Sequence, residues 1–291
     1  MFNKICIVGV GLIGGSIARA ARLNNLSPLI VGFGRESDLA NLQTAKALGV
    51  IDAYSLEINS AIADADCIVI ATPVGAIESV LAQLKPHWSS KAIVTDVGST
   101  KTNVLVAAER VFGFIPDNLV PAHPIAGAEQ SGVAASVGNL FTNKRLIITP
   151  DKVTNPDAVQ QIRAFWECLG AQVAIMDAAH HDAILAATSH LPHIVAFAMV
   201  DMLGHKDEQS EIFKYAASGF RDFSRIASSD PIMWRDICAA NKDEILPLIQ
   251  QLKAELSKIE QLLGSDDTEQ LFNVFTYAGK ARQRFLDLFE N

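Results

Sequence analysis

The chain has 291 residues, close to twice the usual domain size, so we predict two domains that each have a core of their own. Hydrophobic residues make up 49% of the chain and charged residues 19%, which excludes a disordered or fibrous protein. The formal net charge is −8 and Lys and Arg form no cluster, so neither nucleic acid nor a membrane surface is an expected partner.

The first part of the chain alternates short apolar runs with helical stretches. Most of these runs are nearly continuous in Val, Ile and Leu, as expected for parallel strands covered by helices on both faces. We therefore predict an α/β fold over residues 1–177, a doubly wound Rossmann sheet. Its predicted strands are Lys4–Gly9, Leu29–Phe33, Cys67–Ala71, Ala92–Asp96, Asn118–Ala122, Arg145–Thr149 and Gln172–Met176.

Residues 178–291 have a different pattern, rich in Ala, Leu and Ile over helix-length stretches. They predict an all-helical second domain. Its uncharged run Ala183–Val200 includes four polar side chains and Pro192, which favours a helix buried in protein over one buried in lipid. The predicted helices are Ala178–Leu203, Glu208–Ala217, Ile232–Ala240, Lys242–Leu263 and Thr268–Phe289.

Four cysteines are spread along the chain without a CxxC pair. Cys6 and Cys67 lie inside apolar runs, where a thiol is ordinary core filling. This usage predicts a reducing compartment, the cytoplasm.

A glycine-rich segment, Gly9 to Ser16, follows the first predicted strand directly and opens a helix that runs to about Asn24. A lone GxGxxG is a weak signal, but its place after the first strand of a βαβ unit predicts a dinucleotide site. The glycines permit a tight turn, a close approach of the backbone to a pyrophosphate, and close packing of helix and strand, and the helix N-terminus supplies N–H donors. The predicted cofactor contacts in this segment are Gly9, Gly11, Leu12, Ile13 and Gly14.

The end of the second predicted strand bears on which nicotinamide cofactor is used. Gly34 stands where an NAD enzyme usually places an acid, and Arg35 with Ser37 can receive a 2′-phosphate, which favours NADP or the use of both cofactors. In the alternative, which fits NAD, Arg35 stacks on adenine and Glu36 turns back to the ribose. Thr72 and Pro73, after the third strand, are further predicted cofactor contacts.

Polar residues also follow the fourth and fifth predicted strands, over 96–101 and 122–129. Ligands of doubly wound sheets lie outside the carboxyl ends of the strands, so both segments should face the nicotinamide. A histidine there can accept a hydroxyl proton during hydride removal, which makes His123 the catalytic candidate. The alternative is a capping or packing histidine, and the neighbouring Ser99 favours catalysis.

The helical part contains one histidine pair and several arginines. His190 and His193 could hold a metal together with Asp182, His180 or His181, but hydrolytic zinc motifs place their histidines at i, i+4 with a Glu between them, so we predict no metal. Arg221 and Arg225, amid aromatic and small residues, indicate capture of a carboxylate, because the planar guanidinium binds both oxygens. The alternative for some of these arginines is a structural ion pair with Asp222 or Asp236.

Five blocks together resemble the prephenate dehydrogenase family, also called cyclohexadienyl or arogenate dehydrogenase, of tyrosine biosynthesis. They are GVGLIGGS at 9–16, DVGSTK at 96–101, HPIAGAE at 123–129, SHLPH at 189–193 and GFRDFSRIA at 219–227. They occur in the family's order and spacing over nearly the whole chain. The resemblance implies a Rossmann domain followed by a helical dimerisation domain, and hence a homodimer.

The same resemblance implies oxidative decarboxylation of prephenate to 4-hydroxyphenylpyruvate with reduction of NAD(P). It matches His123 with the catalytic histidine and Ser99 with the serine that orients it. Substrate-binding positions are matched by Arg225, His193 and Glu129, the last being an acid near the pocket mouth. Ala128 stands where many members have Thr, which leaves the choice between prephenate and arogenate open.

Two rival functions are weighed against this one. A β-hydroxyacid dehydrogenase typically uses a lysine in the first long helix of its second domain, and Ala178–Leu203 contains none. A nucleotide-sensing Rossmann protein without turnover would not need His123, Ser99, His193 and Arg225 together.

Overall fold

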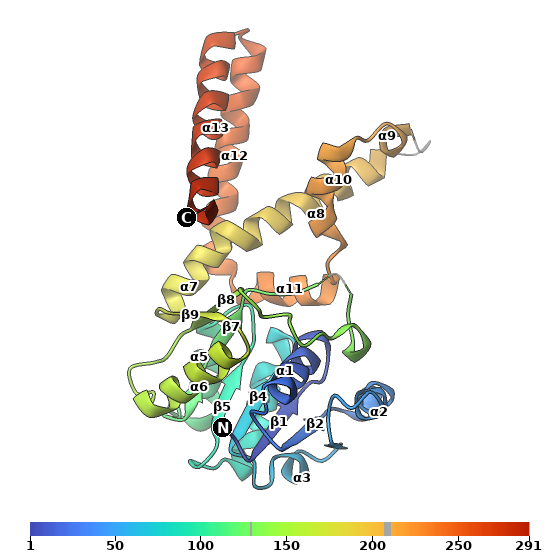
Figure 1. The fold of residues 1–291 in the computed structure, drawn as a ribbon. Helices are drawn as coiled ribbons and strands as arrows, with labels where there is room; N and C mark the ends of the chain where they lie inside the picture. The colour runs from blue at the N-terminus through green and yellow to red at the C-terminus, as the bar shows by residue number, and fades with distance from the viewer. Residues whose placement is uncertain (129, 207–210, 291) are drawn as a thin grey trace. The chain divides into compact units, whose positions relative to one another are not determined.

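The computed structural model describes residues 1–128, 130–206 and 211–290 of the chain (Figure 1). It divides into two compact units, Met1–Lys242 and Asp243–Asn291. This division by compactness falls within the predicted helical domain, and the functional boundary between residues 177 and 178 stays a prediction.

A six-stranded parallel sheet forms the centre of the first unit, in the order β3-β2-β1-β4-β5-β6. This is the Rossmann order, and it confirms the predicted α/β class. The chain reverses its winding between β1 and β4, where dinucleotides bind in such sheets. The strands are β1 (Lys4–Val8), β2 (Leu29–Phe33), β3 (Ala53–Ser55), β4 (Cys67–Ile70), β5 (Ile93–Asp96) and β6 (Leu119–Val120).

Helices cover both faces of this sheet. Successive side chains of a strand point to opposite faces, so Ile5 and Ile7 of β1 enter one buried cluster while Cys6 and Val8 enter the other. The first cluster includes residues of α1 (Leu12–Leu23), α2 (Leu39–Ala47) and α6 (Pro156–Cys168). The second includes residues of α3 (Ile58–Ile62), α4 (Ile77–Leu84) and α5 (Thr102–Phe112).

The prediction of a single sheet with seven strands is wrong. The structure has two sheets, and one of the predicted strands is divided between them. The run Asn118–Ala122 divides at Pro121, which has no N–H to donate to a ladder. The chain after it forms β7 (Ala122–Pro124), which pairs antiparallel with β8 (Arg145–Ile148) in a separate sheet, and β9 (Gln172–Ile175) pairs parallel with β8. Strand β3 was not predicted, because it is only three residues long and half-buried.

The described residues after β9 are mostly helical, as predicted. The long helix expected from Ala178 is interrupted, because Pro192 has no N–H and its ring crowds the carbonyl one turn earlier. A widened π-helical turn, Ala186–His190, separates α7 (Ala178–Leu185) from α8 (Leu191–Lys206). The helix expected over 208–217 lies partly outside the described residues. The remaining elements are α9 (Glu211–Lys214), α10 (Ser218–Ser224), the 3-10 turn η6 (Arg225–Ser228), α11 (Pro231–Ala240), α12 (Lys242–Gly264) and α13 (Thr268–Glu290).

The stretch Ala178–Lys206 is long and apolar enough to cross a membrane, by length and composition only. Of the most apolar 18 residues in this stretch, only 22% are buried within this chain. The expectation that the surrounding protein buries the helix is therefore wrong for a single copy. Its polar residues His181, Asp182 and His190 are nevertheless buried. The stretch therefore combines a polar, buried N-terminal part with an apolar surface that one copy leaves mostly half-buried.

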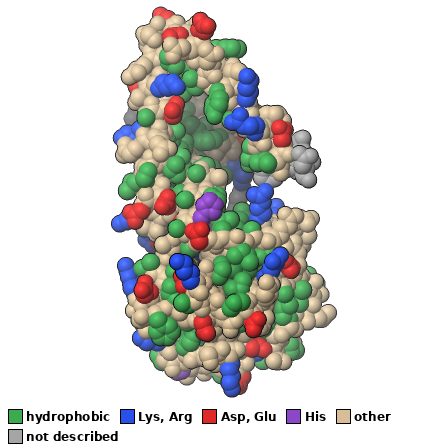
Figure 2. Space-filling model, turned by 90° about the vertical axis from the view of Figure 1, so that its left-hand side faces the viewer, with side chains coloured by type: hydrophobic (Ala, Val, Ile, Leu, Met, Phe, Trp, Pro, Cys, Tyr) green, Lys and Arg blue, Asp and Glu red, His purple; other side chains and the backbone are tan. Residues whose placement is uncertain are grey.

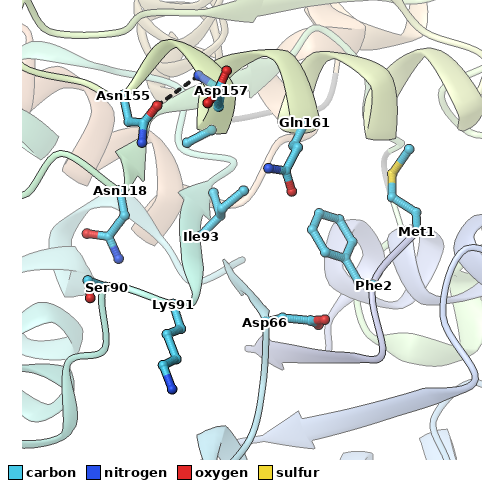
Figure 3. Close-up of a pocket in the computed structure, with 11 residues that line it drawn as sticks. Met1, Phe2, Asp66, Ser90, Lys91, Ile93, Asn118, Asn155, Asp157 and Gln161 are labelled. Atoms are coloured by element: carbon cyan, nitrogen blue, oxygen red, sulfur yellow. Dashed lines mark hydrogen bonds between the residues drawn. The ribbon is translucent and has the colours of Figure 1, made fainter.

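A cavity of about 190 Å³ lies at the amino ends of the parallel strands (Figure 3). Asp66 on its wall already accepts hydrogen bonds from the backbone N–H groups of Asn3 and Lys4, at 2.8 and 3.0 Å. The cavity shares no residue with the predicted site, which lies at the carboxyl ends of the strands. It is lined by Met1, Phe2, Asp66, Ser90, Lys91, Ile93, Asn118, Asn155, Asp157, Ala158 and Gln161.

Candidate active site

The glycine loop between β1 and α1 has the geometry of a dinucleotide site. Gly9 has φ +93°, in the left-handed region that favours glycine, and a Cβ on Gly14 would lie 2.2 Å from the carbonyl oxygen of Gly9. Packing within the protein thus accounts for both glycines. A Cβ on Gly11 would meet nothing within 4 Å, so the open space beside Gly11 is left for a ligand.

Two further observations agree with a bound nicotinamide dinucleotide. Helix α1 begins at Leu12 and Ile13 with no side-chain cap and no acid in its first turn, so its N–H groups are available for an anionic pyrophosphate. Thr72, after β4, has a buried hydroxyl with no hydrogen-bond partner in the described part of the chain. Its methyl carbon would lie 3.1 Å from a Cβ on Gly9, and the adjacent Pro73 is exposed.

At the end of β2, Arg35 pairs with a residue that the sequence analysis did not consider. Its Nε lies 3.2 Å from Oδ2 of Asp38, and its backbone N–H donates to the same oxygen at 2.9 Å. Burial raises the pKa of Asp38, but the hydrogen bonds from Arg35 outweigh it and the pKa is lowered. Ser37 lies 3.5 Å from the same carboxylate, and Gly34 is buried beneath it. A carboxylate thus lies beside the guanidinium of Arg35. The preference for NADP, or for the use of both cofactors, stays a prediction.

A fully buried ion pair joins the segments that carry Ser99 and His123. Nζ of Lys101 donates to Oδ2 of Asp96, at the end of β5, and to the carbonyl oxygen of Ala122 at 2.7 Å. The other oxygen of Asp96 accepts from the N–H of Ala122 at 3.2 Å. These bonds fix the loop after β5 against β7, and they explain why the fourth and fifth strand ends lie together.

Ser99 is half-buried on that loop, and its hydroxyl has no hydrogen bond to any described residue. His123 on β7 is 8% exposed. The structure therefore places both residues on segments that Lys101 holds together, but it gives no direct contact between them.

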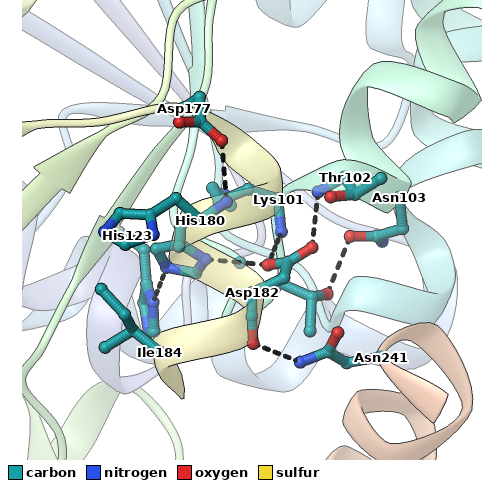
Figure 4. A network of polar contacts seen from close by, with 12 residues as sticks. Lys101, Thr102, Asn103, His123, Asp177, His180, Asp182, Ile184 and Asn241 are labelled. Atoms are coloured by element: carbon teal, nitrogen blue, oxygen red, sulfur yellow. Dashed lines mark hydrogen bonds and ion pairs between the residues drawn. The ribbon is translucent and has the colours of Figure 1, made fainter. Parts of the chain in front are cut away.

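His123 is hydrogen-bonded to α7, and Figure 4 shows the surrounding network. Its Nδ1 lies 2.9 Å from Nε2 of His181, whose Nδ1 lies 2.8 Å from Oδ1 of Asp182. Asp182 also accepts the backbone N–H groups of Lys101 and Thr102, each at 2.8 Å, and thereby caps the N-terminus of α5. Helix α7 is thus joined both to the candidate catalytic histidine and to the loop after β5.

His123 interacts electrostatically with histidines near the π-helical turn. Burial lowers the pKa of His123 well below its ordinary value, and it is lowered further by the charge of Lys101 and by the charges that His181 and His190 carry when they are protonated. Burial also lowers the pKa of His190 to about 4, although Asp182 opposes this shift. The Nδ1 of His190 lies 3.0 Å from Nδ2 of Asn241, which in turn donates to the Asp182 carbonyl.

His193 lies one turn further along, on α8. Its ring stacks on Trp234 with centroids 3.8 Å apart, and its Nδ1 lies 2.8 Å from the carbonyl oxygen of Ser189. Burial lowers the pKa of His193 most, the bond to Ser189 raises it, and the charge of Arg225 lowers it. Arg225 belongs to η6, which packs against α8, so the structure brings these two predicted substrate-binding residues within electrostatic reach.

Two other predicted substrate contacts follow β7. Ala128 is exposed on the loop after the strand, whereas Glu129 lies outside the described residues. Among the residues that the structure describes, no group of three or more His, Cys, Asp or Glu side chains could hold a metal ion. His190 and His193 are turned to Asn241 and Ser189 instead of to a common point.

The comparisons with known proteins identify the family of the chain. The model of the prephenate dehydrogenase nucleotide-binding domain matches residues 17–175, and that of the prephenate dehydrogenase dimerization domain matches residues 177–277. The cyclohexadienyl dehydrogenase of Zymomonas mobilis is 34% identical over 97% of this chain and 96% of its own length. The chain belongs to the prephenate dehydrogenase family. A Bacillus subtilis prephenate dehydrogenase is 38% identical over 96% of this chain and 75% of its own length.

The fold of this prephenate dehydrogenase family member is also found in a solved structure. The prephenate dehydrogenase of Aquifex aeolicus, in complex with hydroxyphenyl propionate and NAD+, has a TM-score of 0.89 at 33% identity, covering 98% of this chain and 99% of that one. The chain is thus an oxidoreductase with a Rossmann domain that binds a nicotinamide cofactor, as the sequence predicted.

Sequence reasoning missed the residues that support His123 in this family member. The sequence indicated Lys101 only as part of the motif at residues 96–101, and His181 and Asp182 only as possible metal ligands. One signal was available: Asp182 borders a long uncharged helix, and a buried acid requires several hydrogen-bond donors.

The low pKa values of His123 and His190 predict a dependence of stability on pH. The folded chain keeps both rings neutral, whereas the unfolded chain binds protons below about pH 6.5. The contribution of the two neutral histidines to the free energy of unfolding should be fully present above that pH. It should decrease as the pH falls from about 6.5 towards 4, by about 1.4 kcal/mol per pH unit for each histidine. Urea unfolding at a series of pH values measures this slope.

The matched controls are two single-histidine variants. His123→Asn should reduce the slope by one group, whereas the exposed His87→Asn should leave it unchanged. A free energy of unfolding that stays constant between pH 7 and pH 5 would contradict the assignment of two neutral buried histidines.

Proposed function

We propose that the chain catalyses the oxidative decarboxylation of prephenate to 4-hydroxyphenylpyruvate with reduction of NAD(P), and that His123 accepts and returns the hydroxyl proton. One observation carries this role for His123. It is buried at the carboxyl ends of the strands with Nδ1 hydrogen-bonded to His181, and Nε2 has no hydrogen-bond partner among the described residues. A neutral imidazole with one free nitrogen is suited to general-base catalysis near neutral pH.

The proton balance of the reaction fits a single histidine. A bound nicotinamide would supply the acceptor for the hydride that leaves the ring carbon bearing the substrate hydroxyl. His123 accepts the proton of that hydroxyl, the bond to the ring carboxylate breaks to release CO2, and the electron pair enters the ring. The phenolate oxygen that results takes the proton back from His123. No proton is gained or lost overall, so the site needs one group that holds a proton for part of the cycle.

Ser99 and the helical residues position the substrate in this proposal. The Ser99 hydroxyl has no hydrogen bond to a described residue, so it is able to bind the substrate hydroxyl or His123. His193 and Arg225 are assigned to a substrate carboxylate, supported by their electrostatic interaction. Glu129 near the pocket mouth, and Ala128 without the hydroxyl of Thr, are proposed to affect the choice between prephenate and arogenate.

Arg225→Ala should chiefly weaken substrate binding. Loss of a charge-assisted contact to a carboxylate is expected to cost about 2–4 kcal/mol in kcat/KM, with most of the change in KM. Steady-state rates over a range of prephenate concentrations measure it. Arg22→Ala is the matched control, because Arg22 pairs with Asp52 away from the site. An unchanged KM in Arg225→Ala would show that another residue binds the substrate carboxylate, and Arg221 is the next candidate.

An assay of prephenate and arogenate, each with NAD and NADP, tests the function directly. We expect turnover of prephenate, and the four kcat/KM values give the preference for substrate and cofactor together. Asp38→Asn removes the carboxylate that faces Arg35, so it should raise the ratio of kcat/KM with NADP to kcat/KM with NAD. Binding of cofactor without oxidation of either substrate would favour the nucleotide-sensing alternative.

We also propose a cytoplasmic homodimer assembled through residues 178–291. Large apolar side chains of α12 and α13 are exposed in one copy, and α13 has no buried side chain among its described residues. Figure 2 shows hydrophobic side chains exposed among charged ones on the face that it presents. A monomer rarely exposes so much apolar surface. Sedimentation equilibrium should give twice the mass of one chain, and a monomer at micromolar concentration would contradict the assembly. The exposed set includes Leu246, Leu256, Leu263, Phe272, Phe275, Tyr277, Phe285 and Leu288.

A further inference from the structure

We propose that His181 and Asp182 are positioning residues that determine which nitrogen of His123 carries a proton, so that Nε2 of His123 is left free to accept the substrate's hydroxyl proton. The inference rests on the proposed function, because it assigns the means by which His123 is kept in its basic tautomer. It concerns only groups of the first compact unit of the chain.

The three side chains form one continuous line of hydrogen bonds. Nδ1 of His123 lies 2.9 Å from Nε2 of His181, and Nδ1 of His181 lies 2.8 Å from Oδ1 of Asp182. Their exposed fractions are 8%, 0% and 2%. Water is therefore largely excluded, and the partner that each nitrogen meets is fixed by the fold.

The direction of each bond follows from the acid at the end of the line. Burial raises the pKa of Asp182, but the hydrogen bonds from His181, Thr102 and Lys101 outweigh it and the pKa is lowered. An ionised carboxylate only accepts hydrogen bonds, so Nδ1 of His181 carries a proton and donates it. A neutral His181 then presents a lone pair on Nε2, which accepts from Nδ1–H of His123.

This direction leaves His123 with a proton on Nδ1 and a lone pair on Nε2. Nε2 has no hydrogen-bond partner among the described residues, so it is the atom available to the substrate. The imidazolium that forms during turnover keeps its Nδ1–H bond to His181, and the negative charge of Asp182 stabilises it. The aspartate of a serine protease holds its histidine in the correct tautomer by the same principle.

A doubly protonated His181 would reverse the first bond. His123 would then accept at Nδ1 and carry its proton on Nε2, where it could not act as a base. The two arrangements place the His123 proton on different nitrogens, and this difference is measurable without turnover.

The first experiment is 15N NMR of the full chain labelled at histidine, with NAD+ bound. The signals of His123 are identified by their loss in His123→Asn. We expect both His123 and His181 of the wild type to be protonated on Nδ1 and bare on Nε2. A proton on Nε2 of wild-type His123 would overturn the proposal.

The second experiment compares two substitutions of His181. His181→Leu removes the acceptor of the His123 Nδ1 proton, so the proton should move to Nε2 and kcat should fall by at least about 10²-fold, with KM changed by less than about threefold. His181→Gln keeps an amide oxygen that can accept from Nδ1–H. It should therefore retain the wild-type tautomer of His123 and recover most of kcat.

Asn118→Leu is the control for a general loss of stability. Asn118 is a buried amide far from this line, whose Nδ2 donates to the carbonyl oxygens of Ala92 and Ser89 at 2.6 and 2.9 Å. If His181→Leu lowers kcat no more than Asn118→Leu does, or if His123 keeps its Nδ1 proton in His181→Leu, the positioning role is wrong. Absence of prephenate turnover in the wild type would refute the proposed function instead, while the NMR measurement still decides the tautomer.

Discussion

His123→Asn is expected to lower kcat by about 10²- to 10⁴-fold while KM changes by only a few-fold, because a general base acts in the transition state. The asparagine amide can still donate to Nε2 of His181, so the buried line of hydrogen bonds keeps a partner and the fold should be retained. Initial rates with prephenate and the preferred cofactor measure kcat and KM. Binding of the reduced cofactor, followed by its fluorescence, should be unchanged.

The exposed His87→Asn is the control for this substitution, because His87 lies on the turn after α4, away from the carboxyl ends of the strands. Its kcat and KM should equal those of the wild type. If His123→Asn retained kcat within about threefold of the wild type, His123 would have no part in the proton transfer.

Lys101→Met is expected to have the largest effect on stability. The substitution leaves the fully buried carboxylate of Asp96 without its cation. Breaking a buried pair by removing one partner typically costs about 3–5 kcal/mol, because an uncompensated charge remains inside. Urea unfolding at a fixed protein concentration measures this loss, since association of chains would make stability depend on concentration.

A second substitution separates the buried charge from the lost packing of Lys101. Asp96→Asn combined with Lys101→Met removes both charges, so it should recover part of the free energy of unfolding. Lys85→Met is the matched surface control, because Lys85 is exposed and its amine donates to the carbonyl oxygen of Val111 at the surface. It should cost less than about 0.5 kcal/mol. A loss below about 1 kcal/mol in Lys101→Met would show that Asp96 does not depend on this cation.

The strands of the first sheet were predictable because each is a local apolar run. The division of Asn118–Ala122 was marked by Pro121, but the sequence could not show that the chain continues into a second sheet. That outcome depends on β8, whose residues pair with β7 from more than twenty positions away. β3 was missed because a strand of three half-buried residues gives no periodic signal.

The sequence by itself determined the cofactor loop, the family blocks, and His123 and Ser99 as the candidates at the strand ends, because turn glycines and apolar runs act over short distances. Only the tertiary structure decided what supports His123. His181 lies 58 positions further along the chain, and it meets His123 only because α7 packs against α5. The buried pair of Lys101 and Asp96 is likewise recognisable only from burial. A hydrogen-bond partner inside a protein is chosen by which groups exclude water together, and that depends on the packing of elements that the sequence alone does not place.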